Sequence, residues 1–141
     1  MIEICPGDWV YGVTKCFLFD GVNSRNWQEA HDFCDGLDAV TLGNGDVIGP
    51  SLAFLENQEE FALSKTHLPN SWVWSNCNKL NINAPWVCVT DRAGTTSQYR
   101  DWGPGQPEDD RCVISYQDQM HDQDCNINSG TGTSCQVNIS A

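Results

Sequence analysis

The sequence predicts an α+β domain that is held together by disulfide bonds. Its 141 residues are enough for a sizeable core, and a 40% hydrophobic content with six tryptophans argues against disorder. The eight cysteines form an even set without a Cys-x₂-Cys pair, which favours four disulfides over a Cys₄ or Cys₂His₂ zinc site. Two helical patterns lie among short strand patterns, and no repeat or linker divides residues 1–141. We therefore expect one domain with two helices packed on short antiparallel sheets.

The first two elements are a hairpin and a helix. Residues 5–19 are strand-rich, with glycines at turn positions, and predict a β-hairpin. Apolar residues then recur at helical spacing, and Ser24 or Asn26 can cap the helix that we expect over about 26–37.

A glycine-rich break leads into a strand and a second helix. The apolar run Ser51–Leu55 is most simply a short strand. Asn57 is followed three residues later by Glu60, which approximates a capping box and predicts a helix that ends near Lys65–Thr66.

The rest of the chain predicts short strands separated by turns. Four apolar or alternating runs are bounded by turn residues. They are Ser71–Ser75, Pro85–Val89, Arg111–Tyr116 and Ser134–Ile139.

Charge and cysteine content restrict the partners and the compartment. Seven basic residues against nineteen acidic ones give a net charge of −12, which disfavours nucleic acid and anionic membrane surfaces. Four disulfides indicate a secreted protein or a receptor ectodomain. The sequence lacks an apolar run near the ~18 residues of a membrane span. No signal peptide is recognised, and Met1 directly before a mature-looking start suggests a chain trimmed for expression.

Acidic residues are concentrated between Tyr99 and Cys125. Seven of the nineteen acids lie in this stretch, in one group before Cys112 and another before Cys125. If these two cysteines pair, both groups are drawn together, and many oxygen ligands on one patch suit a hard cation such as Ca²⁺. The alternative is that these acids are solvated loop residues.

Several motifs, in this order, resemble those of a C-type lectin-like domain over nearly the whole chain. Cys5-Pro6, Trp9 and Cys16-Phe17 look like the N-terminal hairpin of the long form, and Trp27, Ala30 and Cys34 are similar to the first-helix signature. The run from Leu52 to Phe61 resembles the next strand and the start of the second helix. Trp72-Val73-Trp74 resembles the central strand. The most specific match is Trp102-Gly103-Pro104-Gly105-Gln106-Pro107 followed by Cys112.

The resemblance implies a disulfide pattern and a role for the tryptophans. It implies the pairs Cys5–Cys16, Cys34–Cys135 and Cys112–Cys125, and leaves Cys77–Cys88. It also assigns all six tryptophans to the framework, so that none is expected as a platform for sugar stacking.

The same resemblance implies a shared site for a cation and a sugar. The side chains that flank the family's cis proline correspond to Gln106 and Glu108. A third ligand corresponds to Asp110, and the family's Trp-Asn-Asp triplet reads Met120-His121-Asp122 here. The implied ligand-binding set is Gln106, Glu108, Asp109, Asp110 and Asp122, with Gln106, Glu108, Asp110, His121 and Asp122 around the metal. Since only an X-Pro bond becomes cis at low cost, the turn requires its proline.

Three departures from the family pattern affect this expectation. The loop between Glu108 and Asp110 is short, Glu108 is longer than the expected aspartate, and His121 replaces an asparagine. Because zinc accepts histidine together with carboxylates, we expect Zn²⁺ to bind here more tightly than Ca²⁺. The alternative is that His121 is a surface residue without a ligand.

Catalysis is not expected. His31 reads as a helix-face residue and His67 as a polar group at a helix C-terminus. The cysteines are assigned to bridges, and nothing indicates an apolar pocket that would separate the pKa values of Asp109 and Asp110.

We therefore expect a recognition domain. One hypothesis is a metal-dependent lectin, in which the Gln-Pro-acid order resembles that of galactose-type members. The other is a protein-binding ectodomain of the natural-killer-receptor type with a degenerate sugar site. The expected partner is thus a glycan or a protein, and assembly as a homodimer is left open.

Overall fold

The computed structural model describes residues 3–116 and 118–139, which contain two helices and eleven strands. The helices are α1 (Trp27–Asp35) and α2 (Gln58–His67). The strands are β1 (Val10–Tyr11), β2 (Lys15–Asp20), β3 (Val40–Thr41), β4 (Val47–Ile48), β5 (Ser51–Leu52), β6 (Trp72–Asn78), β7 (Val87–Val89), β8 (Thr96–Ser97), β9 (Cys112–Tyr116), β10 (Gln119–Gln123) and β11 (Thr131–Asn138). This mixture confirms the predicted α+β class.

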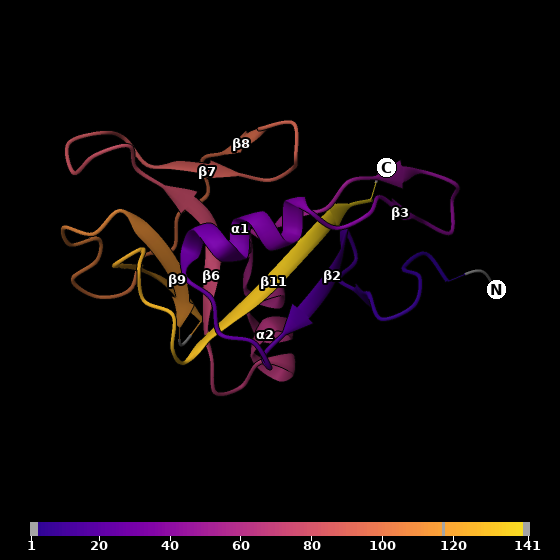
Figure 1. Ribbon diagram of the computed structural model, residues 1–141, viewed down its shortest axis with the longest axis horizontal. Coiled ribbons are helices and arrows are strands. Elements are labelled where there is room, and N and C mark those ends of the chain that lie inside the picture. The colour runs from indigo at the N-terminus through magenta and orange to yellow at the C-terminus, as the bar shows by residue number, and fades with distance from the viewer. Residues whose placement is uncertain (1–2, 117, 140–141) are drawn as a thin grey trace.

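The long strand β11 joins the two halves of the main sheet (Figure 1). On one side it pairs with β2 in antiparallel register, from Lys15–Asn138 to Asp20–Thr133. On the other side it pairs with β6 in parallel, and β6 continues through β7 to β8. Strands β9 and β10 form a hairpin that attaches to β6 through β9. Because β9 and β10 belong to the acidic stretch, the sheet gives that stretch a rigid base.

Helix α1 begins where the sequence predicted a cap. The Asn26 side chain accepts a hydrogen bond from the Glu29 backbone N–H (2.8 Å), and the Glu29 carboxylate accepts one from the Asn26 N–H (3.0 Å). This reciprocal pair satisfies two N–H groups that a helix start leaves free. The helix buries Trp27, Ala30 and Cys34 against the core.

Helix α2 is capped by only half of such a motif. The Asn57 side chain accepts a hydrogen bond from the Glu60 N–H (2.9 Å). The Glu60 carboxylate does not return the bond to Asn57, because it instead contacts the Lys15 ammonium group (2.9 Å) and the Glu56 N–H (2.8 Å). The predicted helix is confirmed, while Glu60 links it to β2.

All four expected disulfides are present. The bonds are Cys5–Cys16, Cys34–Cys135, Cys77–Cys88 and Cys112–Cys125. Cys34–Cys135 fastens α1 to β11, and Cys77–Cys88 fastens β6 to β7. The bridge between Cys112 and Cys125 closes the β9–β10 hairpin, which supports the candidate site.

Several strands differ from the sequence prediction. β10 was not predicted, since Gln119–Gln123 is mostly polar, and the short strands β3, β4 and β8 were missed. The expected strand Ser51–Leu55 is only two residues long, and Ala53 to Leu55 continue from it as irregular chain in the core.

The expectation that every tryptophan belongs to the framework is wrong for one residue. Trp74 is 1% exposed and Trp27 is 7% exposed, whereas Trp72 is 37% exposed. Trp72 stands at the first position of β6, where its side chain leaves the sheet toward solvent.

Neither described helix is long and apolar enough to cross a membrane.

Candidate functional site

The loop that carries the candidate site is anchored to β10. The Met120 N–H donates to the Asp101 carbonyl (2.7 Å), and the Gly103 N–H donates to the Met120 carbonyl (2.9 Å). Met120 is completely buried, so it occupies a core position. A Cβ atom on Gly103 would lie 2.6 Å from Cε1 of His121, so the His121 ring would have to move to admit any other residue. These hydrogen bonds therefore fix the position of the loop against β10.

Gln106 connects the proline turn to the sheet. The Gln106–Pro107 peptide bond is cis, as the sequence resemblance implied. The Gln106 side-chain carbonyl accepts a hydrogen bond from the Asp122 N–H (3.0 Å), and its amide group donates to Glu108 Oε1 (3.1 Å). One side chain thus holds Glu108 beside the backbone of β10.

Asp122 is the buried member of the site. Its residue is only 6% exposed, and Oδ2 accepts a hydrogen bond from the Asp110 N–H (2.9 Å). Oδ1 is buried without a hydrogen-bond partner in the described structure. A buried unsatisfied carboxylate oxygen is costly in proteins, and an ion is one of the partners that can satisfy it.

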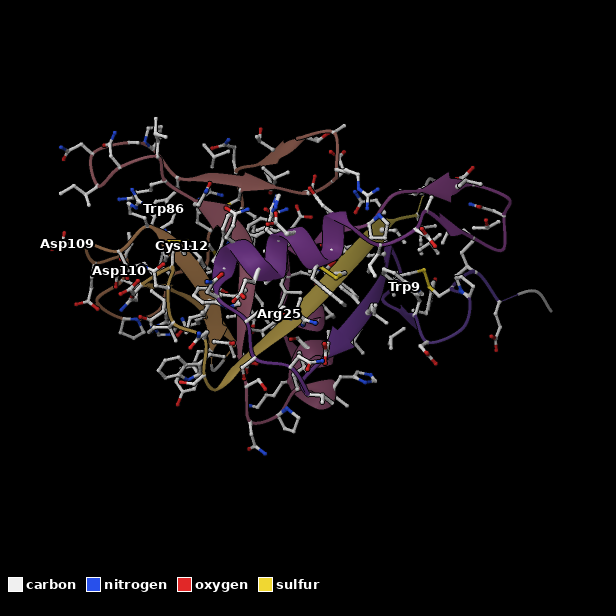
Figure 2. All side chains as sticks on the ribbon, viewed as in Figure 1. Trp9, Arg25, Trp86, Asp109, Asp110 and Cys112 are labelled. Atoms are coloured by element: carbon white, nitrogen blue, oxygen red, sulfur yellow. A yellow bond between two sulfur atoms is a disulfide. The ribbon has the colours of Figure 1, made fainter. Side chains whose placement is uncertain are left out.

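The site carries an excess of negative charge. The pKa of Asp110 is raised by burial and then by the negative charges of Asp122, Asp124, Glu108 and Asp109. Figure 2 shows Asp109 and Asp110 together at one edge of the molecule, on the side of Trp86 and away from Trp9. A bound cation would relieve this repulsion.

Arg111 does not neutralise this charge in the described structure, but holds a neighbouring loop. Its guanidinium group donates to the Leu80 carbonyl (3.1 Å), and its own carbonyl accepts a hydrogen bond from the Lys79 N–H (2.9 Å). The hairpin between Cys77 and Cys88 is therefore tied to the site loop. Sequence reasoning missed this role, since the contact joins residues 31 positions apart without a local motif.

His121 lies apart from these carboxylates. Along β10, Met120 and Asp122 are buried while His121 is half-buried, as expected when successive side chains point to opposite faces of a strand. The imidazole ring lies against Gly103 and edge-on to Tyr116, with ring centroids 5.8 Å apart. The structure thus gathers Gln106, Glu108, Asp110 and Asp122 but does not bring His121 into the group.

The other two histidines lie elsewhere. His31 stacks on Trp27 with ring centroids 5.2 Å apart, on the face of α1. His67 stacks on Phe19 at 4.8 Å, at the end of α2.

The site offers the oxygen ligands that a hard cation prefers, although the side chains are not arranged to surround an ion. The available atoms are carboxylate and amide oxygens, which Ca²⁺ prefers. Within residues 3–116 and 118–139, however, no three His, Cys, Asp or Glu side chains stand close enough to hold a metal ion together. Binding would require Glu108 and Asp110 to turn toward the unpartnered oxygen of Asp122.

Comparison with solved structures identifies the fold. The carbohydrate-recognition domain of cow CD23 superposes with a TM-score of 0.75 at 20% identity, over 99% of both chains. The chain has the C-type lectin-like fold. The domain of murine dendritic cell inhibitory receptor 2, solved in complex with N-glycan, gives a TM-score of 0.72 at 20% identity over 95% of this chain and 98% of that one. A calcium-independent type II antifreeze protein gives 0.74 at 21% identity over 98% and 97%.

The sequence relatives of this chain are distant. No family model matches the sequence. C-type lectin domain family 4 member M of Symphalangus syndactylus is 24% identical over 89% of this chain and 28% of its own length. The low affinity immunoglobulin epsilon Fc receptor of Mus musculus is 26% identical over 74% of this chain and 27% of its own length. The chain thus spans between a quarter and a third of these relatives. The names of these relatives describe binding proteins, in agreement with the expectation that this domain is not an enzyme.

Proposed function

We propose that this domain binds glycans outside the cell through a Ca²⁺ ion held by Gln106, Glu108, Asp110 and Asp122. The observation that carries the proposal is the buried, unpartnered Oδ1 of Asp122, in a network centred on the cis-proline turn. Asp109 lies beside the ion site as an exposed acid that a ligand hydroxyl group can reach.

The proposed ion would supply attraction for the oxygens of a sugar. Ca²⁺ takes six to eight oxygen ligands, so a site with few protein oxygens leaves positions for hydroxyl groups. Asp122 would hold the ion from the buried side of the site, Glu108 and Asp110 from the side nearer the solvent, and Gln106 from the proline turn. The glycan-bound dendritic cell receptor domain has the same fold, which supports a sugar as the ligand.

The ion is proposed to be calcium in preference to zinc. Zinc was expected from sequence on the basis of His121, whose ring lies against Gly103 on the face of β10 opposite Asp122. Without imidazole, the remaining ligands are oxygens, which favour the harder ion.

Calorimetry on metal-free protein can test the ion and its ligands. We expect Ca²⁺ to bind to the wild type, Asp122→Asn to weaken binding at least about tenfold, and His121→Ala to leave it unchanged. His121 is the matched control because it neighbours Asp122 on the same strand. Absence of Ca²⁺ binding would overturn the proposal, and tighter Zn²⁺ binding that is lost in His121→Ala would restore the zinc hypothesis.

A glycan array with and without chelator can test the ligand. The Gln106-Pro107-Glu108 order favours galactose-type glycans, with weak affinity because the short loop lacks an aromatic residue to pack on the sugar. We expect binding to disappear in chelator. Strong binding, or a preference for mannose, would contradict the galactose assignment.

A protein ligand is the second candidate function. The hairpin tied to the site loop exposes three large aliphatic residues: Leu80 is 84% exposed, Ile82 59% and Val87 42%. Exposed apolar side chains beside a binding surface are typical of protein interfaces. Chelator-resistant binding to a protein ligand that is lost in Leu80→Asp would favour this function over the lectin.

A further inference from the structure

A cavity lies at the opposite end of the β9–β10 hairpin from the carboxylate site. It has a volume of about 460 Å³ and opens between the end of α2, the start of β6 and the end of β9. Its lining includes Lys65, Asn70, Trp72, Val73, Tyr116 and Asp118. Because Cys112 and Tyr116 are the two ends of β9, about 13 Å of strand separates this cavity from the proposed ion site.

Two exposed aromatic rings line this cavity. Trp72 is 37% exposed and Tyr116 is 40% exposed, with ring centroids 6.0 Å apart in an edge-to-face arrangement. Trp72 and Tyr116 each belong to a strand whose other residues are mostly buried, so these two residues are the exposed exceptions in their strands. Exposed Trp and Tyr offer a rigid apolar surface and a polar group at low entropic cost.

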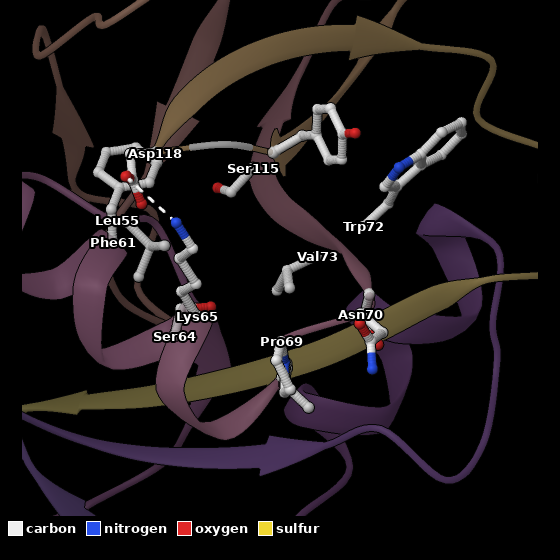
Figure 3. A pocket seen from close by; sticks show the side chains of 13 residues that line it. Leu55, Phe61, Ser64, Lys65, Pro69, Asn70, Trp72, Val73, Ser115 and Asp118 are labelled. Atoms are coloured by element: carbon white, nitrogen blue, oxygen red, sulfur yellow. Dashed lines mark ion pairs between the residues drawn. The ribbon is translucent and has the colours of Figure 1, made fainter.

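The rim opposite Trp72 is polar but electrically balanced. The Lys65 ammonium group lies 3.8 Å from the Asp118 carboxylate, and Figure 3 shows this pair across the hollow from Trp72, with Val73 between them. Asn70 has an exposed side chain on the Trp72 side of the cavity (Figure 3), where its amide can both donate and accept hydrogen bonds. Such a rim suits an uncharged ligand that carries both donors and acceptors.

The walls of the cavity are fixed before any ligand arrives. The Leu68 N–H donates to the Ser64 carbonyl (2.7 Å), and the Trp72 N–H donates to the Gly130 carbonyl (3.0 Å). A Cβ atom on Gly132 would lie 3.1 Å from Leu68 Cδ1, so glycine lets this segment lie close on β11. A pre-organised site binds with less loss of conformational entropy.

We propose that this cavity binds an uncharged hexose residue of a glycan without a metal ion. The C–H face of a hexose ring is apolar and packs on Trp72 or Tyr116, while its hydroxyl groups reach Asn70, Lys65 and Asp118. The volume falls within the range of small-ligand sites. The chain would then have two glycan sites, of which only one requires a cation.

NMR titration of the full chain in chelator can test this site. The probes are the methyl glycosides of galactose, glucose, mannose and N-acetylglucosamine. We expect at least one of them to shift the Trp72 indole and Tyr116 signals, and Trp72→Ala and Asn70→Ala to weaken this binding about tenfold. Asn70 is an exposed loop residue, so its variant remains informative if Trp72→Ala does not fold.

Two controls separate this site from the carboxylate site. Asp122→Asn should leave binding in chelator unchanged, as should Tyr11→Ala, which removes an aromatic residue that is 55% exposed at a remote strand. Loss of the shifts in Asp122→Asn would overturn the separate site. Absence of shifts with every glycoside would overturn the hexose assignment.

Discussion

Lys15 is a buried cation that joins β2 to the start of α2. The residue is 4% exposed, and its ammonium group contacts the carboxylates of Glu56 (2.8 Å) and Glu60 (2.9 Å) and the Phe54 carbonyl (2.8 Å). Glu60 is itself only 3% exposed. Two buried opposite charges tolerate burial only as a pair, since either alone would lose its water without compensation.

Removing this cation should therefore destabilise the fold strongly. We expect Lys15→Ala to lower the free energy of unfolding by about 3–5 kcal/mol, because Glu60 would remain buried and unpaired. Lys65→Ala is the matched control, since its ion pair with Asp118 is exposed and contributes at most about 1 kcal/mol. Urea denaturation measures both, and equal effects would contradict this interpretation.

The ionised carboxylate of Asp110 lowers the stability of the fold, in contrast to the ion pairs of Lys15. Its pKa is raised by burial and by the surrounding acids, so the folded protein binds this proton more tightly than the unfolded chain. The ionised carboxylate therefore disfavours the fold above its raised pKa, and this cost disappears below the ordinary value of about 3.9.

In metal-free protein, Asp110→Asn should increase stability at neutral pH. We expect a gain of about 0.5 kcal/mol, because solvent screens a partly exposed charge, and no gain at a pH below about 3.9. Thermal unfolding of both proteins across this pH range provides the measurement. A gain that persists in acid would mean that the charge of Asp110 is not the cause.

At the scale of the elements, capping residues predicted both helices well. Asn26 and Asn57 act as caps, since a cap is a local signal that the chain displays within four residues. β10 was not predicted, because the Gln-Met-His-Asp-Gln sequence becomes a strand only through pairing with β9. β10 also determines which side chains form the site, because the alternation along the strand places His121 and Asp122 on opposite faces. The exposure of Trp72 was also missed, because an aromatic residue in an apolar run usually packs in the core.

The two caps should contribute unequally. Asn26→Ala removes the side-chain acceptor of the Glu29 N–H, so that Glu29 keeps only the backbone N–H of residue 26 as its partner in the motif. Asn57→Ala also removes one hydrogen bond, but Glu60 stays fixed by Lys15. We expect a loss of about 1–2 kcal/mol for Asn26→Ala and about 1 kcal/mol or less for Asn57→Ala. Chemical denaturation should rank the variants in that order, and the reverse order would show that Glu60 depends on its cap.

At the scale of the whole molecule, the resemblance correctly placed the disulfides and the order of the motifs. The composition indicated a disulfide-stabilised domain, and the four disulfides of the structure agree with it. The geometry of the site required more, because hydrogen bonds between residues 12 and 16 positions apart, such as Asp110–Asp122 and Gln106–Asp122, determine which oxygens meet. No local pattern encodes those distances.

The pairing of β2 with β11 determines how the chain responds to tension between its two ends. Lys15 pairs with Asn138 at the end of the sheet from which both segments leave, so a pulling force opens the ladder one residue pair at a time. Such unzipping resists force weakly, but it stops when the load reaches the bond between Cys34 and Cys135.

Single-molecule force spectroscopy can detect this stop. The spans of 11 and 101 residues closed by Cys5–Cys16 and Cys34–Cys135 should remain hidden from the load, making the extension about 400 Å shorter than in reductant. Full extension without reductant would contradict this. Since Gln106 to Asp122 and the Trp72 cavity both lie within the protected span, both proposed sites would be shielded from a load applied to the chain ends.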